Sequence, residues 1–126
     1  MEPKKYILLV DDDPLLSRLY ETTLKNAGYE VCTASNGEMA LTEINKKKPN
    51  LALLDIMMPK MNGIELLKRI KEDKNNENIK IIILTNMGRN TEEAKNARDM
   101  GANDHLIKSE TSLKELLSRV SAVLGN

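Results

Sequence analysis

The sequence predicts an α/β protein in which helices cover both faces of a parallel β-sheet. Apolar runs without polar alternation indicate strands that are buried on both faces, as in parallel sheets. Three such runs span residues 6–10, 51–54 and 81–84, and polar side chains follow them: Asp11, Asp55 and Thr85. Helical repeats of apolar residues separate the strands, and this alternation over short connections favours right-handed crossovers within one sheet.

The length and composition indicate a single domain with no net charge. The 126 residues include 19 Lys and Arg and 19 Asp and Glu, so no net charge or basic block favours nucleic-acid binding. The one cysteine, Cys32, lies in an apolar strand, which favours a reduced, buried thiol in a cytosolic protein. The first apolar run is too short for a signal peptide or a membrane span. We therefore expect one cytoplasmic domain over residues 1–126, with no output domain in this chain and no direct nucleic-acid or membrane partner.

The first half of the chain predicts three strands and two helices. Strand 6–10 leads into three acids, of which Asp13 can cap a helix that begins at Pro14 and ends at Gly28. Apolar residues spaced by three and four predict the inward face of this helix. That face comprises Leu15, Leu16, Leu19, Thr23, Leu24 and Ala27. Strand 30–34, a helix from Asn36 to the Lys run 46–48, and strand 51–55 follow.

The second half repeats the alternation. A helix opens at Asn62-Gly63, and the polar stretch 71–78 is expected to be a flexible loop. Strand 79–85 is rich in β-branched residues. Asn90 and Glu93 then resemble a capping box for a helix with a thin apolar face of Ala94, Ala97 and Met100. A fifth strand, 104–107, precedes Lys108, and Ser112 with Glu115 caps the last helix.

Polar residues at the strand ends predict a shared site. In the flavodoxin-like strand order 2-1-3-4-5, the first and third strands are neighbours at the switch point. Asp11, Asp12 and Asp55 should therefore lie together, with Thr85 and Lys108 flanking the same crevice.

This combination of residues suits phosphoryl chemistry on a carboxylate. Crowded acids repel each other unless a cation is present, and Mg²⁺ prefers carboxylate, carbonyl and phosphate oxygens. Asp12 and Asp55 could supply carboxylates, and the backbone carbonyl near Met57 could add a further ligand. A carboxylate can attack phosphorus when metal, lysine and hydrogen-bond donors neutralise the transferred group, and Lys108 and Thr85 fit those needs.

The chain resembles the receiver domains of bacterial response regulators in two-component signalling. The resemblance is carried by the run 7–13, by Leu-Asp-Ile-Met-Met-Pro-Lys-Met-Asn-Gly at 54–63, by Ile-Leu-Thr at 83–85 and by Leu-Ile-Lys at 106–108. It implies that Asp55 is the phosphoacceptor, that Asp12 binds Mg²⁺ directly and that Asp11 does so through water. By the same resemblance, Met57 lends its carbonyl to the metal, and Thr85 and Lys108 contact the phosphoryl group.

The resemblance also implies partners and a switch. The phosphodonor would be a histidine kinase or phosphotransfer protein, and the protein would catalyse only its own phosphorylation and dephosphorylation. Phosphorylation would change the surface formed by the last two helices and the fifth strand, which binds a downstream protein target. The domain would be a monomer or a phosphorylation-dependent dimer.

Three positions depart from the family pattern. Asn86 stands where a small residue is usual, Ser109 stands where proline usually follows the lysine, and His105 replaces a common aromatic residue with a switching role. Two other readings remain. A pseudo-receiver would bind partners without phosphate, and a dehalogenase-type Mg²⁺-dependent phosphohydrolase would use an acid after the first strand, although its Asp-x-Asp-Gly-Thr signature is absent.

Overall fold

The described residues form one parallel sheet of five strands. The computed structural model describes residues 4–56, 58, 61–86 and 92–125. The strand order is β2-β1-β3-β4-β5, which confirms the expected flavodoxin-like α/β fold. The strands are β1 (Tyr6–Val10), β2 (Glu30–Ala34), β3 (Leu51–Asp55), β4 (Lys80–Thr85) and β5 (Asp104–Ile107).

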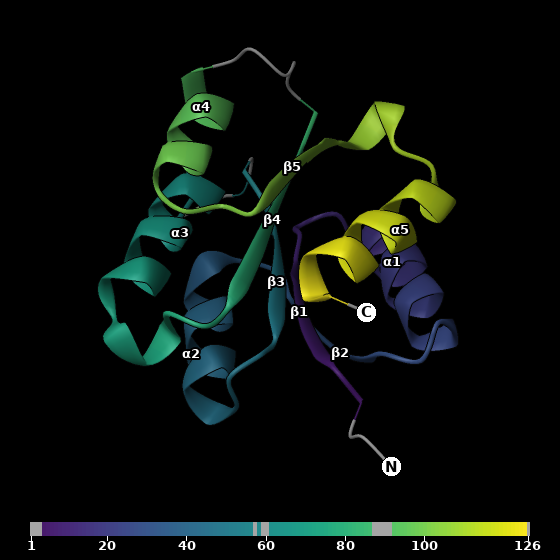
Figure 1. Ribbon diagram of the computed structural model, residues 1–126, viewed down its shortest axis with the longest axis horizontal. Coiled ribbons are helices and arrows are strands. Elements are labelled where there is room, and N and C mark those ends of the chain that lie inside the picture. The colour runs from purple at the N-terminus through teal and green to yellow at the C-terminus, as the bar shows by residue number, and fades with distance from the viewer. Residues whose placement is uncertain (1–3, 57, 59–60, 87–91, 126) are drawn as a thin grey trace.

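Helices cover both faces of the sheet (Figure 1). One face carries α1 (Pro14–Asn26) and α5 (Leu113–Leu124), and the other carries α2 (Gly37–Lys46), α3 (Gly63–Glu72) and α4 (Glu92–Asp99). Two short 3-10 turns, η1 (Lys74–Asn76) and η2 (Lys108–Glu110), complete the described elements. Within the described ranges, no helix has the length and apolar character needed to traverse a bilayer.

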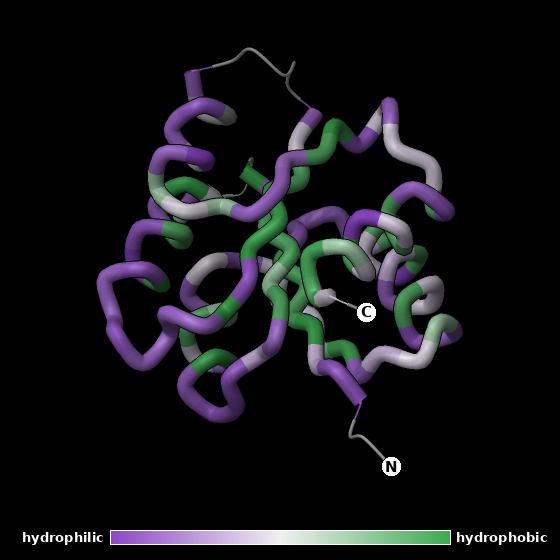
Figure 2. Tube along the Cα trace, viewed as in Figure 1, coloured by the Kyte–Doolittle hydropathy of each residue, from purple (hydrophilic) through white to green (hydrophobic). Residues whose placement is uncertain are grey.

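The sheet separates two hydrophobic cores. Along β1, Leu8 and Val10 face the core under α2, α3 and α4, while Ile7 and Leu9 face the core under α1 and α5. Successive side chains of a strand point to opposite faces, so a strand covered on both sides must be apolar throughout. Figure 2 shows this as hydrophobic strands in the middle of the molecule and hydrophilic turns around them.

The helix starts follow the expected capping residues. The Asp13 side chain accepts hydrogen bonds from the backbone N–H groups of Leu15 and Leu16 at 3.0 and 3.2 Å. Side chains of Asn36, Asn62 and Ser112 cap α2, α3 and α5 in the same way. These bonds satisfy donors that a helix leaves unpaired at its first turn. The predicted cap at Asn90 lies outside the described residues.

The predicted inward face of α1 is only partly right. Leu24 is buried and Leu16 packs partly buried against the core, as predicted, but Leu15 is 80% exposed and Leu19 is 46% exposed. Ser17 and Tyr20 are buried instead, at the helical spacing of three and four from Leu24. Tyr20 can occupy the core because its ring is apolar even though its tip is polar.

Two further sequence expectations need correction. Residues 71–78 are not one flexible loop: α3 continues through Glu72, η1 follows, and Asn76 is 3% exposed. The Asp73 carboxylate accepts the Asn75 N–H at 2.9 Å, so polar residues here order the turn instead of loosening it. Cys32 is half-buried rather than buried, because β2 is an edge strand.

Candidate functional site

The ends of β1, β3 and β4 place the predicted acids and hydroxyl in one region. β1 pairs with β3, with Val10 opposite Leu54, so Asp11 and Asp55 follow neighbouring positions. β3 pairs with β4, with Asp55 opposite Leu84, so Thr85 comes next along β4. The carboxyl ends of parallel strands meet at one edge of the sheet, where ligands of such folds bind.

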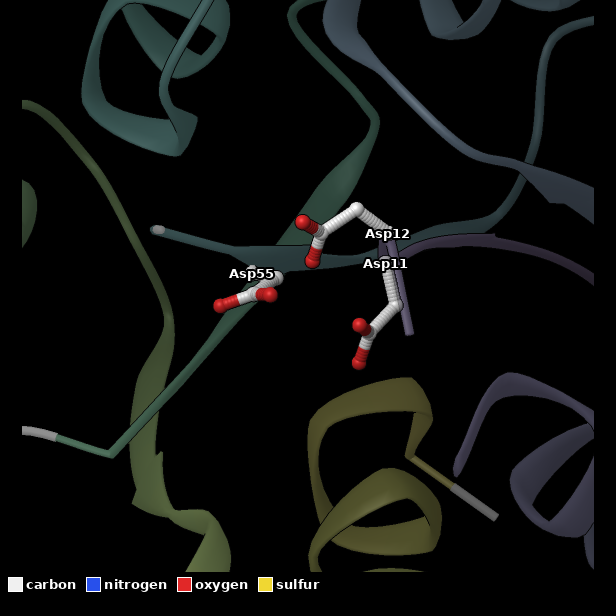
Figure 3. A group of neighbouring side chains, drawn as sticks. All are labelled: Asp11, Asp12 and Asp55. Atoms are coloured by element: carbon white, nitrogen blue, oxygen red, sulfur yellow. The ribbon is translucent and has the colours of Figure 1, made fainter. Parts of the chain in front are cut away.

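Three acids form a compact group at this edge. One carboxylate oxygen each from Asp11, Asp12 and Asp55 lies within 4.8 Å of the other two. Asp11 and Asp55 are buried, at 2% and 4% exposure, whereas Asp12 is exposed. Figure 3 shows Asp12 directed toward Asp55, while the carboxylate of Asp11 turns toward α5. The structure thus brings together the acids that the strand ends predict.

Lys108 joins two of these acids. Its Nζ lies 2.8 Å from Asp11 Oδ2 and 3.1 Å from Asp55 Oδ2, and the lysine side chain is only 8% exposed. Burial lowers the pKa of Lys108, but the hydrogen bond to Asp11 and the charges of Asp11 and Asp55 outweigh it and raise the pKa above its ordinary value. The ammonium group therefore remains charged beside Asp55.

Asp11 is held through both of its oxygens. Oδ1 accepts the backbone N–H of Asp13 at 2.9 Å, and Oδ2 accepts the Lys108 ammonium at 2.8 Å. Asp13, which caps α1, thereby also orients the acid at the end of β1. Sequence reasoning assigned Asp13 only to the helix cap, because a bond between residues two positions apart depends on the turn that connects them.

Gly63 is a residue of the site that sequence reasoning placed only at a helix start. A Cβ atom at Gly63 would lie 2.9 Å from the Asp55 carbonyl carbon and still closer to its oxygen. Its N–H donates to the Ile56 carbonyl at 3.0 Å. The first turn of α3 can therefore press directly on the backbone of the candidate phosphoacceptor only because residue 63 lacks a side chain.

Tyr20 is a second residue that sequence reasoning missed. Burial raises the pKa of its hydroxyl, with opposing effects from the charge of Lys108 and from those of Asp11 and Asp55. Its side chain is 4% exposed and belongs to the core under α1 and α5. The signal in the sequence was a tyrosine at helical spacing from Ser17 and Leu24.

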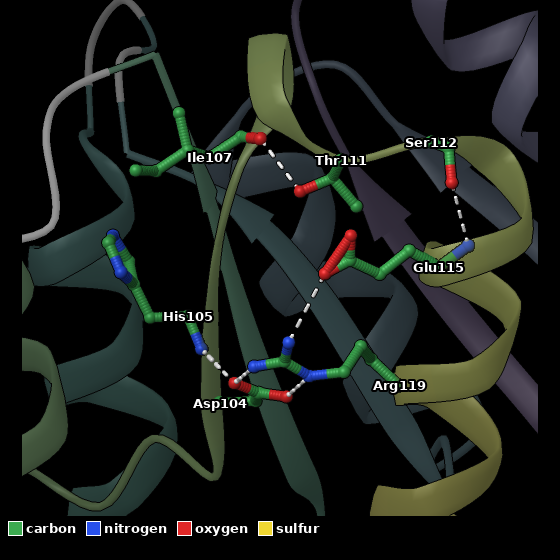
Figure 4. A network of polar contacts seen from close by, with 7 residues as sticks. All are labelled: Asp104, His105, Ile107, Thr111, Ser112, Glu115 and Arg119. Atoms are coloured by element: carbon green, nitrogen blue, oxygen red, sulfur yellow. Dashed lines mark hydrogen bonds and ion pairs between the residues drawn. The ribbon is translucent and has the colours of Figure 1, made fainter.

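The remaining predicted positions lie around this group. Thr85 is fully buried at the end of β4. Asn86 is exposed, and Ser109 lies in η2. His105 lies on β5, with its ring on the opposite side of the strand from Arg119 (Figure 4). Met57 lies outside the described residues, so its expected carbonyl ligand stays a prediction.

The donor set fits a hard divalent cation. Mg²⁺ prefers oxygen ligands, is commonly held by one or two carboxylates, and keeps several waters. Asp12 and Asp55 offer carboxylates on one side of the group, and the exposure of Asp12 leaves room for water. Lys108 supplies a fixed positive charge next to Asp55. The arrangement can neutralise an incoming phosphoryl group beside a carboxylate nucleophile.

Comparison with known proteins gives a consistent answer. The family model described as the response regulator receiver domain matches residues 7–121. The probable transcriptional regulator ycf27 of Cyanophora paradoxa is 40% identical over 121 residues, which are 96% of this chain and 48% of that protein. The chain therefore spans about half the length of the curated relatives it matches.

Solved structures match over nearly the whole chain. A putative response regulator from Chloroflexus aurantiacus has a TM-score of 0.88 and 34% identity, covering 98% of this chain and 100% of that one. The receiver domain of the sensor histidine kinase PA1611 from Pseudomonas aeruginosa has a TM-score of 0.87 and 26% identity, covering 98% and 100%. That structure has a magnesium ion coordinated in its active-site cleft.

Proposed function

This chain belongs to the response regulator receiver domain family, and on that premise we propose that Asp55 accepts a phosphoryl group and thereby switches a protein-binding surface. Phosphorylation and Mg²⁺ binding are typical of this signalling family, whose receiver domains interact with histidine kinases. The observation that carries the proposal is the Lys108 ammonium, held 3.1 Å from Asp55 within a group of three acids.

Residues of this chain provide the nucleophile, a positive charge and a hydrogen-bond donor for the phosphoryl transfer. An Asp55 carboxylate oxygen attacks phosphorus, and the bond from phosphorus to the donor's histidine nitrogen, or to the oxygen of a small acyl phosphate, breaks with its electron pair going to the leaving group. Lys108 pairs with the phosphoryl oxygens, and the Thr85 hydroxyl donates to one of them. Asp12 and Asp55 directly, Asp11 through water and the Met57 carbonyl would hold Mg²⁺, which would supply further positive charge when bound.

The proposed switch uses the surface of α4, β5 and α5. The new phosphoryl charge draws Thr85 and Lys108 inward, and these residues end β4 and follow β5. His105 on β5 changes position with them and alters what the surface presents to a downstream protein, with the domain as a monomer or as a phosphorylation-dependent dimer. We propose a cytoplasmic domain that contacts proteins rather than nucleic acid. The regulatory role in the name of ycf27 concerns that longer relative.

Replacement of Asp55 tests the proposal directly. Purified protein is incubated with acetyl phosphate and Mg²⁺, and the addition of one phosphoryl group is measured by intact mass and phosphorus NMR. We expect labelling of the wild type and of the Asp13→Asn control, which retains a side chain able to cap α1, and none of Asp55→Asn. Equal labelling of Asp55→Asn would show that another residue is the acceptor.

A further inference from the structure

Thr111 closes the segment that carries Lys108 from β5 toward α5. Its hydroxyl donates a hydrogen bond of 2.7 Å to the backbone carbonyl of Ile107 (Figure 4). Ile107 is the residue directly before Lys108. The backbone N–H of Thr111 reaches the Lys108 carbonyl only at 3.5 Å. The side-chain bond is therefore the shorter of the two contacts that close η2.

The Ile107 carbonyl needs a partner from outside the sheet. β5 is an edge strand, and its residues direct their backbone groups alternately toward β4 and away from the sheet. The Leu84 carbonyl accepts the Ile56 N–H between β4 and β3, so the backbone groups of Leu84 point toward β3. Those of the next residue, Thr85, therefore point toward β5. Ile107 lies opposite Thr85 and therefore directs its carbonyl outward, to the position where Thr111 meets it.

Within the part of the chain that the structure describes, η2 has little other side-chain support. The position before η2 makes no side-chain cap bond, and Ser109 and Glu110 are exposed. Lys108 itself must nevertheless place its ammonium between two carboxylates, at 2.8 and 3.1 Å, with 8% of its side chain exposed. Such a narrow placement requires a fixed direction of the backbone where Lys108 leaves β5.

We propose that Thr111 is the positioning residue for Lys108. By fixing the carbonyl that precedes Lys108, its hydroxyl sets the direction in which the lysine reaches Asp11 and Asp55. The placement of the lysine is a structural role, and its effect on phosphorylation rests on the proposed function of Asp55. Thr111 also lines a groove of about 390 Å³ along β5 and α5, so its hydrogen bond connects that surface to the charged group.

The first experiment measures the accessibility of Lys108 without any phosphorylation. Folded protein is treated briefly with an amine-acetylating reagent, and the modification rate of each lysine is determined by mass spectrometry. Thr111→Val removes the hydroxyl and keeps the branched shape, Thr111→Ser keeps the hydroxyl, and Ser112→Ala removes the neighbouring cap of α5 without touching Ile107. Thr111→Ala replaces Thr111→Val if valine prevents folding.

We expect Lys108 to react roughly fivefold faster in Thr111→Val, the effect of losing one hydrogen bond, and at the wild-type rate in Thr111→Ser and Ser112→Ala. Lys114, exposed on α5, should react equally in all variants and reports on general loosening. Equal Lys108 rates in wild type and Thr111→Val would overturn the proposal. An equal increase in Ser112→Ala would also overturn it, since any weakening of α5 would then suffice.

The second experiment asks whether Thr111 acts through Lys108. The rate of phosphorylation by acetyl phosphate is compared in wild type, Thr111→Val, Lys108→Met and the double variant. We expect Thr111→Val to slow the reaction in the presence of Lys108 and to have no further effect in its absence. Independent, multiplying effects would overturn the positioning role. If wild-type Asp55 takes no phosphoryl group, the proposed function fails. The acetylation rate of Lys108 in the first experiment then still decides the role of Thr111.

Discussion

Lys108 balances the charge of the site at the scale of single residues. Asp11 and Asp55 are both buried, and two ionised carboxylates can share such a place only beside a cation. Lys108 fills that role with contacts of 2.8 and 3.1 Å. A metal ion bound by Asp55 must therefore share this carboxylate with an ammonium group that repels it.

This competition predicts the effect of removing the lysine charge. Lys108→Met should bind Mg²⁺ more tightly than the wild type by roughly tenfold, or about 1.4 kcal/mol, because the acids lose their internal cation. Isothermal titration calorimetry measures the affinity. Lys114→Met, which removes one positive charge at an exposed position of α5, serves as the charge-matched control. Unchanged or weaker binding by Lys108→Met would show that the lysine does not compete with the metal.

A second ion pair, between Asp104 and Arg119, makes stability depend on pH. Arg119 Nε and Nη2 each lie 2.6 Å from an Asp104 oxygen, and the Asp104 side chain is 19% exposed. Burial raises the pKa of Asp104, but its hydrogen bonds with Arg119 and the His105 N–H and the nearby positive charge leave the pKa below its ordinary value of 3.8. The pair therefore stabilises the fold above about pH 4 and loses this effect as the pH falls through the folded-state pKa.

Asp104→Asn tests this dependence. Near pH 7 the variant should unfold at lower urea than the wild type, by no more than about 1 kcal/mol because Arg119 is partly exposed. The difference should disappear in strong acid, where Asp104 is protonated in both states. Urea unfolding of both proteins across this pH range gives the comparison. A difference that persists unchanged at the lowest pH would assign the effect to packing.

At the scale of elements, the junction of β3 and α3 depends on a close backbone approach. A side chain at Gly63 would meet the Asp55 backbone, which cannot move without shifting the site. A side chain at Gly37, which begins α2, would meet the Met61 side chain instead, 2.7 Å from its sulfur and 2.9 Å from its Cβ. The sulfur end of a methionine is flexible and can move aside, and its Cβ can follow with a small shift of residue 61, which lies outside the regular elements.

Gly63→Ala should therefore lower the free energy of unfolding more than Gly37→Ala does. We expect a loss of about 1–3 kcal/mol for Gly63→Ala and a smaller loss for Gly37→Ala, although alanine favours a helix equally at both starts. Urea unfolding measures stability, and the phosphorylation rate with acetyl phosphate reports on Asp55. Equal stability losses would indicate that the β3 backbone yields as readily as Met61.

The same elements show what the sequence could and could not predict. The capping residues and strand runs are local signals, and they located β1, β2, β3, β5 and the starts of α1, α2, α3 and α5. The buried face of α1 depends on which side the sheet lies, so apolar character alone misassigned Leu15 and Leu19. The contact of Gly63 with Asp55 and the bond from Asp13 to Asp11 depend on three-dimensional approach, which residue type does not encode.

At the scale of the whole molecule, the strand order explains how distant residues meet. Asp11 and Lys108 are 97 positions apart, yet their side chains form an ion pair because β1 and β5 end at the same edge of the sheet. The core under α2, α3 and α4 holds these helices unequally. The helix α3 places the large side chains of Leu66, Leu67 and Ile70 in the core. Among the described side chains of α4, only the small Ala97 is buried there.

This inequality predicts where the molecule responds to phosphorylation. Small buried contact implies a low cost of rearrangement, so α4 and the adjoining β5 and α5 should change most when Asp55 carries a phosphoryl mimic. Hydrogen–deuterium exchange with and without beryllium fluoride and Mg²⁺ measures this, and Asp55→Asn under the same conditions controls for unspecific effects. Changes centred on α2 or β2 would contradict the proposed switch surface, because β2 lies on the far side of β1 from β4 and β5, and α2 packs against β1 and β2.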